Sequence, residues 1–185
     1  MSSIAKFKKE KFKSLTENKI FICLLTTIFY CVKFKVKVYV AESCTGGQLS
    51  SALSKLPGSS LWFELGVVSY SNNSKNRLLD VNENSLMQDG AVSSLVAKEM
   101  VKGLSKLDDT KNGVYISITG IAGPTGSTSD KPIGLVYFCC FKDQFLIQSE
   151  QRFSGNRTTI QKLAVFWALQ CIRNVLATSC IKNNL

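Results

Sequence analysis

One stretch of the sequence constrains the fold most strongly, because an alternating run leads directly into a pair of glycines. Apolar residues recur at every second position across residues 33–41, which is the pattern of a β-strand with one buried face. Gly46 and Gly47 then permit a tight turn, and residues 48–56 can form a short helix that ends before Pro57. A strand, a turn and a helix in this order predict an α/β fold.

The same alternation of elements continues along the chain. Further strands are predicted at residues 65–71, 114–119, 135–141 and 145–153, the last two joined by a short hairpin. Helices are predicted at residues 20–32, 73–79, about 93–106 and 157–177. Helices separated by strands, with one hairpin, indicate a single α/β domain around a mixed sheet.

Positive charge is concentrated at the N-terminus. Residues 1–37 contain nine lysines and two glutamates, whereas the rest of the chain has fourteen Lys or Arg against eleven Asp or Glu. We interpret residues 1–19 as a solvated basic arm and residues 20–180 as the folded domain. The arm lacks a recognised nucleic-acid motif, so nucleic acid and membranes are not expected partners. The apolar run at 20–32 is too short to span a bilayer and predicts a buried helix.

Cysteine and histidine usage limits the chemistry. The seven cysteines are odd in number and include no C-x-x-C pair, which argues against a disulfide framework and a thiolate zinc site. We expect reduced cysteines in a cytoplasmic protein, without metal or cofactor. The chain has no histidine, so Ser-His-Asp and Cys-His catalysis are excluded. Any catalysis must use Lys, Tyr, carboxylates, Ser, Thr, Cys or backbone donors.

Polar segments follow four of the predicted strands, at residues 42–47, 70–75, 119–126 and 154–157. Ligands of open α/β sheets bind beyond the carboxyl ends of the parallel strands, so these segments are predicted to surround one pocket. Its candidate side chains are Ser43, Tyr70, Lys75, Thr119 and Arg157.

That set of side chains suits acyl transfer without histidine. A lysine buried in a pocket can lose its proton readily enough to activate a serine, and glycine-rich backbone can bind an oxyanion or a phosphate. Each residue also has a simpler interpretation: Ser43 as a helix cap, Cys44 as a small buried apolar residue, Arg157 as a surface residue of a first helical turn. The residues by themselves therefore indicate an α/β domain with a small-anion pocket.

The ordered set of motifs is more specific than its parts. The segments AESCTGG, GSSLWFELGVVSYSNNSK, GAVS, SITGIAGPTG, KPIGLVYF and FSGNR resemble the CinA C-terminal domain family, the nicotinamide-nucleotide amidases, over about residues 38–177. The resemblance implies a three-layer α/β/α sandwich around a mixed, mostly parallel sheet. It also implies deamidation of nicotinamide mononucleotide (NMN) to nicotinate mononucleotide and ammonia, within pyridine-nucleotide recycling in the bacterial cytoplasm, by a homo-oligomer that needs no metal. Residues 20–32 differ from the polar first helix usual in this family.

The resemblance also assigns roles. It implies that Ser43 is the nucleophile and that Tyr70 and Lys75 are its partners, with the division between base and proton relay left open. The expected oxyanion donors are backbone N–H groups of residues 44–47. The residues expected to bind substrate are Glu42, Thr45, Gly46, Gly47, Asn72, Thr119, Gly120, Gly123 and Arg157. Two alternatives remain: a non-catalytic nucleotide-sensing module of the same fold, and a nucleic-acid or membrane-surface accessory acting through the first 37 residues.

Overall fold

The computed structural model describes residues 3–182, with side chains described for residues 17–179. Its centre is a five-stranded sheet in the order β2-β1-β3-β4-β5. The pairs β1–β2 and β1–β3 are parallel, and the pairs β3–β4 and β4–β5 are antiparallel. The predicted mixed sheet is therefore confirmed. The strands span β1 Lys37–Glu42, β2 Phe63–Val68, β3 Gly113–Gly120, β4 Leu135–Lys142 and β5 Phe145–Arg152.

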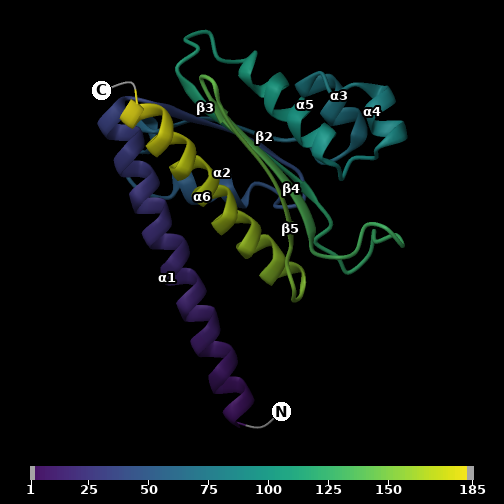
Figure 1. Ribbon diagram of the computed structural model, residues 1–185. Helices are drawn as coiled ribbons and strands as arrows, with labels where there is room; N and C mark the ends of the chain where they lie inside the picture. Colours follow the sequence, from purple (N-terminus) through teal and green to yellow (C-terminus); the bar gives the residue numbers. More distant parts are fainter. Residues whose placement is uncertain (1–2, 183–185) are drawn as a thin grey trace.

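Helices cover both faces of the sheet, which confirms the three-layer α/β/α prediction (Figure 1). One layer contains α1 (Ser3–Phe34), α2 (Gln48–Ser54) and α6 (Arg157–Lys182). The other contains α3 (Asn72–Leu79), α4 (Glu83–Gln88) and α5 (Ser94–Ser105). A 3-10 turn, η1 (Ser59–Leu61), precedes β2. Each face of the sheet has its own hydrophobic cluster, because strand residues alternate between the two faces.

The first helix is longer than the sequence indicated. It begins at Ser3 and ends at Phe34, so it runs unbroken through the boundary predicted at residue 19. Lys35 has a left-handed backbone (φ 55°), and the N–H of Val36 donates to the Cys31 carbonyl at 2.9 Å. This closure ends the helix and delays the strand to Lys37, although the alternating pattern begins at residue 33. Within residues 3–182, no helix is long and apolar enough to cross a membrane.

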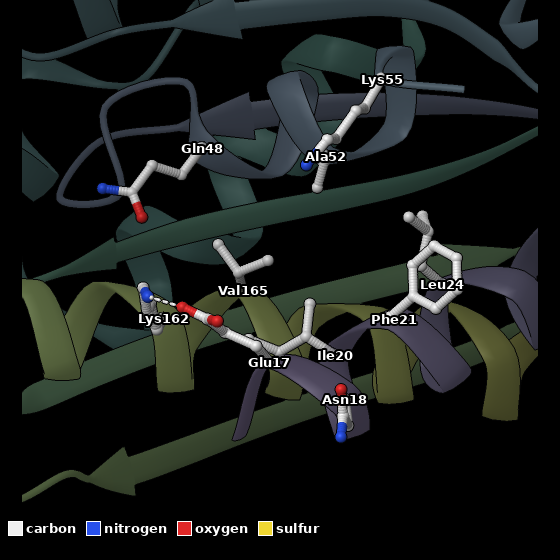
Figure 2. A pocket seen from close by; sticks show the side chains of 10 residues that line it. All are labelled: Glu17, Asn18, Ile20, Phe21, Leu24, Gln48, Ala52, Lys55, Lys162 and Val165. Carbon is white, nitrogen blue, oxygen red and sulfur yellow. Dashed lines mark hydrogen bonds and ion pairs between the residues drawn. The ribbon is translucent and has the colours of Figure 1, made fainter. Parts of the chain in front are cut away.

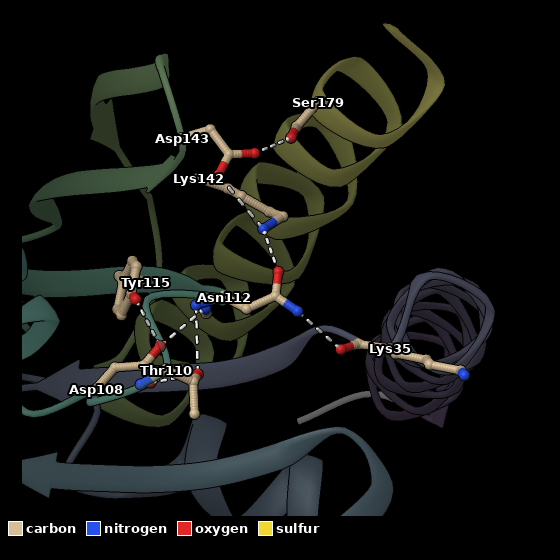
Figure 3. A network of polar contacts seen from close by, with 9 residues as sticks. Lys35, Asp108, Thr110, Asn112, Tyr115, Lys142, Asp143 and Ser179 are labelled. Atoms are coloured by element: carbon tan, nitrogen blue, oxygen red, sulfur yellow. Dashed lines mark hydrogen bonds and ion pairs between the residues drawn. The ribbon is translucent and has the colours of Figure 1, made fainter. Parts of the chain in front are cut away.

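A polar network joins the end of α1 to the sheet (Figure 3). Lys142, almost completely buried, donates to Asn112 Oδ1 at 3.0 Å and lies 3.6 Å from Asp143 Oδ1. Asn112 Nδ2 donates in turn to the carbonyl of Lys35 at 3.3 Å. Beside them, Asp108 accepts from the turn that leads into β3. This network stands at the amino end of β3, so it stabilises the sheet at the end opposite to the predicted pocket.

Candidate active site

The loop after β1 is held in place by a buried carboxylate. Glu42 Oε2 accepts from the N–H groups of Gly47 and Leu49, each at 3.1 Å, and Oε1 accepts from the Ser50 N–H at 2.8 Å and hydroxyl at 2.7 Å. These bonds satisfy backbone donors at the start of α2, which otherwise has no side-chain cap. The Ser43 N–H donates to the carbonyl of Ile118 on β3 at 3.0 Å. Ser43 is thus fixed at the carboxyl end of the sheet.

Lys75 lies against the Ser43 hydroxyl. It belongs to α3, whose N-terminus is closed by a capping box between Ser71 and Ser74. Its side chain is fully buried, and its Nζ is 3.0 Å from Ser43 Oγ. The same amine donates to the Ser69 carbonyl at 2.7 Å. The parallel pairing of β1 with β2 brings these residues together, because α3 follows directly after β2.

Burial disfavours the charged form of the Lys75 amine. More of this amine than of a surface lysine is therefore neutral, and able to accept a proton, near neutral pH. Removal from water lowers the pKa of Lys75 from 10.5 to about 8. Among the described residues, no carboxylate forms an ion pair with it. A substantial fraction of the amine is therefore neutral near pH 8 and can accept a proton from Ser43.

Burial has the opposite effect on Cys44, because it suppresses the reactive form of the thiol. It is buried, and burial raises the pKa of its thiol to about 12. The thiol is therefore protonated near neutral pH and is a poor nucleophile. Its carbonyl accepts from Gln161 Nε2 at 2.8 Å, and Gln161 Oε1 accepts from Gln48 Nε2 at 2.8 Å. Gln161 was not among the predicted site residues, because its only signal in the sequence is a polar residue on the buried side of α6.

A cavity of about 300 Å³ opens in front of Ser43 and Lys75. Seven of the predicted site residues line it. They come from the carboxyl end of β3, from the segments that follow β1, β2 and β3, from α3 and from the start of α6: Ser43, Tyr70, Lys75, Thr119, Gly120, Gly123 and Arg157. The structure therefore brings the four polar segments to one pocket. Its volume lies at the lower end of the range of about 300–1,000 Å³ that is usual for small-molecule sites.

Five predicted substrate-binding residues lie outside this lining. Glu42 caps α2, as described above, and Thr45 is fully buried with a hydroxyl that has no partner among the described residues. Gly46 and Gly47 form the turn, with φ values of 60° and 91° that favour glycine. Asn72 is exposed and borders a separate cavity of about 280 Å³ beside α3 and α4. In this structure these five residues belong to or adjoin the loops that follow β1 and β2.

Arg157 and Tyr70 form the mouth of the cavity. Arg157 Nη1 donates to the Gly123 carbonyl at 2.7 Å, and Nη2 donates to the Tyr70 hydroxyl at 3.2 Å. Tyr70 is 61% exposed, and its contact with Lys75 is through its backbone carbonyl at 3.4 Å. Its hydroxyl therefore lies with Arg157 at the opening, whereas Lys75 contacts the Ser43 hydroxyl directly.

Thr119 supports the wall of the cavity. It is fully buried, and its hydroxyl donates to the Ala91 carbonyl at 2.6 Å. Ala91 and Val92 in turn line the cavity. These two small residues were not among the predicted site residues, although they belong to the GAVS segment, residues 90–93, that contributes to the family resemblance. No group of three or more Cys, Asp or Glu side chains suited to a metal ion occurs among the described residues.

Comparisons with known proteins show which family this chain resembles. A family model described as "CinA C-terminal domain" matches residues 26–176. A "CinA-like protein" of Syntrophomonas wolfei is 49% identical over 140 residues, which are 76% of this chain and 33% of that protein. The "Nicotinamide-nucleotide amidohydrolase PncC" of Enterobacter agglomerans is 43% identical over 134 residues, 72% of this chain and 80% of that protein. This chain thus spans only about a third of the length of such CinA-like relatives.

Solved structures show the same likeness. The crystal structure of the competence/damage inducible protein CihA from Agrobacterium tumefaciens has a TM-score of 0.81 and is 31% identical, with 85% of this chain and 95% of that chain covered.

Proposed function

This chain belongs to the CinA C-terminal domain family, and on that premise we propose that it is an amidohydrolase that converts NMN to nicotinate mononucleotide and ammonia. The 43% identical relative named as a nicotinamide-nucleotide amidohydrolase supports this substrate. The observation that carries the proposal is the 3.0 Å contact between Lys75 Nζ and Ser43 Oγ, made by a fully buried lysine.

The first half of the reaction forms an acyl-enzyme. Neutral Lys75 takes the hydroxyl proton of Ser43 as the Ser43 oxygen bonds to the carboxamide carbon of the substrate. The Lys75 ammonium then gives that proton to the amide nitrogen, the C–N bond breaks, and ammonia leaves. The contact geometry supports Lys75 as the base, since the Tyr70 hydroxyl is bonded to Arg157.

The second half releases the product. Water attacks the acyl carbon while Lys75 accepts a proton from it, and the Ser43 oxygen recovers a proton from Lys75 as the ester bond breaks. Nicotinate mononucleotide forms as the carboxylic acid and loses its proton to solvent water, so it leaves as the carboxylate. The lysine returns to its neutral state, so the cycle needs no added co-reactant besides water.

Backbone donors near Ser43 would stabilise the oxyanion. Of the four N–H groups expected for this role, that of Gly46 already donates to the Ser43 carbonyl, and that of Gly47 donates to Glu42. We therefore assign the oxyanion to the N–H groups of Cys44 and Thr45. The Arg157 guanidinium at the mouth is the group suited to the nucleotide phosphate, because it offers paired donors and a fixed positive charge.

The test is ammonia release from NMN by the purified protein, beside Ser43→Ala, Lys75→Met and the control Cys44→Ala. We expect release by wild type, loss of at least about a thousandfold in the first two variants, and retention of most activity in Cys44→Ala. If the wild type binds NMN in calorimetry but releases no ammonia, the chain is a nucleotide-sensing module instead. Full activity in Ser43→Ala would refute the covalent mechanism.

A further inference from the structure

The outward face of α1 is unusually apolar. Five large side chains, 43–64% exposed, lie on it within twelve residues, and we call them the α1 stripe: Phe21, Ile22, Leu25, Phe29 and Val32. Residues 22, 25, 29 and 32 are spaced three and four apart, so they project from one side of the helix. Isolated exposed apolar residues are common on proteins, but a contiguous stripe of five marks an interaction surface.

The opposite face of the same helical turns is already buried. Cys23, Leu24, Thr27 and Cys31 pack in the layer formed with α6, and the Thr27 hydroxyl lies 3.4 Å from the Leu169 carbonyl. This part of α1 is therefore apolar on both faces, while α6 covers only one (Figure 1). A helix that is apolar all round is normally covered all round, by a protein core or by lipid.

Lysines border the stripe. Lys19 is exposed before it, and Lys33 Nζ lies 5.9 Å from the centre of the Phe29 ring. The sequence of the preceding helical turns adds lysines at positions 6, 8, 9, 11 and 13. Long cationic side chains beside apolar ones are typical of helices that lie in a membrane interface, where the amines meet lipid phosphates. A second copy would instead bring the same positive charge against itself.

A groove beside the stripe also combines apolar side chains with lysines (Figure 2). A cavity of about 430 Å³ lies between α1, α2 and α6, with Phe21, Leu24 and Val165 among its apolar lining. Lys55, at its edge, has no hydrogen bond or ion pair with the described residues. Lys162, on another side, pairs with Glu17 at 2.6 Å. Phe21 belongs to both the stripe and this groove, so the two adjoin, and the polar part of the groove's lining includes both lysines.

We propose that the α1 stripe docks the protein on an anionic lipid surface. Its apolar side chains enter the boundary of the acyl chains, and the lysines contact the headgroup phosphates. The docking is peripheral, in line with the lack of a spanning helix among residues 3–182. The residues that line the cavity in front of Ser43 all lie outside α1, so the stripe forms no part of that cavity. This inference is independent of the proposed amidase activity.

The experiment is co-sedimentation of the full chain with vesicles of phosphatidylcholine alone and of phosphatidylcholine with phosphatidylglycerol. We compare wild type with the double variant Ile22→Ser/Phe29→Ser and with Met87→Ser, a control that removes an even more exposed apolar side chain from α4 in the other helix layer. We expect wild type and Met87→Ser to bind the vesicles that contain phosphatidylglycerol but not those of phosphatidylcholine alone. This binding should weaken at high salt. The double variant should bind about a hundredfold more weakly, roughly tenfold for each side chain.

Two results would overturn the proposal. One is that the double variant binds anionic vesicles as well as wild type does. The other is that wild type fails to bind them; if analytical ultracentrifugation without lipid then shows a dimer that the double variant abolishes, the stripe is an interface between copies. Circular dichroism melting of all three proteins tests whether they are folded. We expect all three to be folded, because the substituted side chains are exposed.

Discussion

Replacing Lys75 with methionine should make the folded protein more stable while removing its proposed base. Methionine is close to lysine in length and is apolar, so it fits a fully buried position. The replacement eliminates the cost of keeping an amine in a site that disfavours its charge. Catalytic groups held in unfavourable surroundings are a recurrent source of such stability–activity conflict.

The magnitude follows from the pKa. The pKa of Lys75 falls from 10.5 in water to about 8 in the folded protein, and one pKa unit is worth about 1.4 kcal/mol. At pH 7 the buried lysine therefore lowers the free energy of unfolding by about 3 kcal/mol. Losing the hydrogen bond to the Ser69 carbonyl costs the variant about 1 kcal/mol. The net gain of about 2 kcal/mol corresponds to a rise in Tm of about 4–8 °C for a chain of this size.

The gain depends on pH with a definite sign. Between pH 8 and 10.5 the unfolded lysine keeps its proton while the folded one has lost it, so wild-type stability rises with pH in that window. The advantage of Lys75→Met should be full at pH 7 and absent at pH 10.5. Urea unfolding followed by circular dichroism at both values measures it, with Lys98→Met on the exposed side of α5 as the control. A variant less stable than wild type at pH 7, or a difference unchanged by pH, would refute the reasoning.

Four further substitutions probe the framework of the fold, at the site and away from it. Glu42→Gln should lower the free energy of unfolding in urea by about 2 kcal/mol, because one amide oxygen cannot accept all four bonds of the carboxylate. Gly103→Ala should lower the free energy of unfolding by more than about 2 kcal/mol, since the added Cβ would lie 1.7 Å from the Leu79 carbonyl oxygen. Gly46→Ala has open space around the added Cβ but a φ of 60°, so it should lower the same free energy by about 1 kcal/mol. Burial alone would raise the pKa of Asp108, but the hydrogen bonds it accepts outweigh burial and hold that pKa below its usual range. Stability should therefore fall on acidification through the ordinary carboxyl range, and more steeply in wild type than in Asp108→Asn, as measured by Tm against pH.

Local patterns in the sequence were sufficient for most of the secondary structure. The strand predicted at residues 114–119 lies within β3, and the helix predicted at 157–177 lies within α6. These succeed because the period of the apolar residues reports which side of an element is buried, whatever it packs against. The short helix α4 was missed, since six residues carry too little periodicity, and the end of α1 depended on the backbone turn at Lys35.

The position of the polar segments after the predicted strands was enough to predict one pocket, but residue types alone could not divide the roles. Glu42 beside Ser43 was predicted to bind substrate, and the structure uses its carboxylate to hold the start of α2. The sequence left the division between base and proton relay open for Tyr70 and Lys75. In the structure the Tyr70 hydroxyl lies against Arg157 and the Lys75 amine against Ser43, which supports Lys75 as the proposed base. Such choices depend on side-chain direction, which the sequence does not encode locally.

The sequence by itself determined the α/β alternation, the absence of histidine chemistry and the family. Only the tertiary structure decided that Ser43 and Lys75, 32 residues apart, come within 3.0 Å, and that the amine is fully buried there. The same holds for the α1 stripe: the sequence predicted a buried helix, and the packing of α6 on one face alone left the other exposed. The physical reason is common to both, because burial and pKa depend on neighbours supplied by distant parts of the chain.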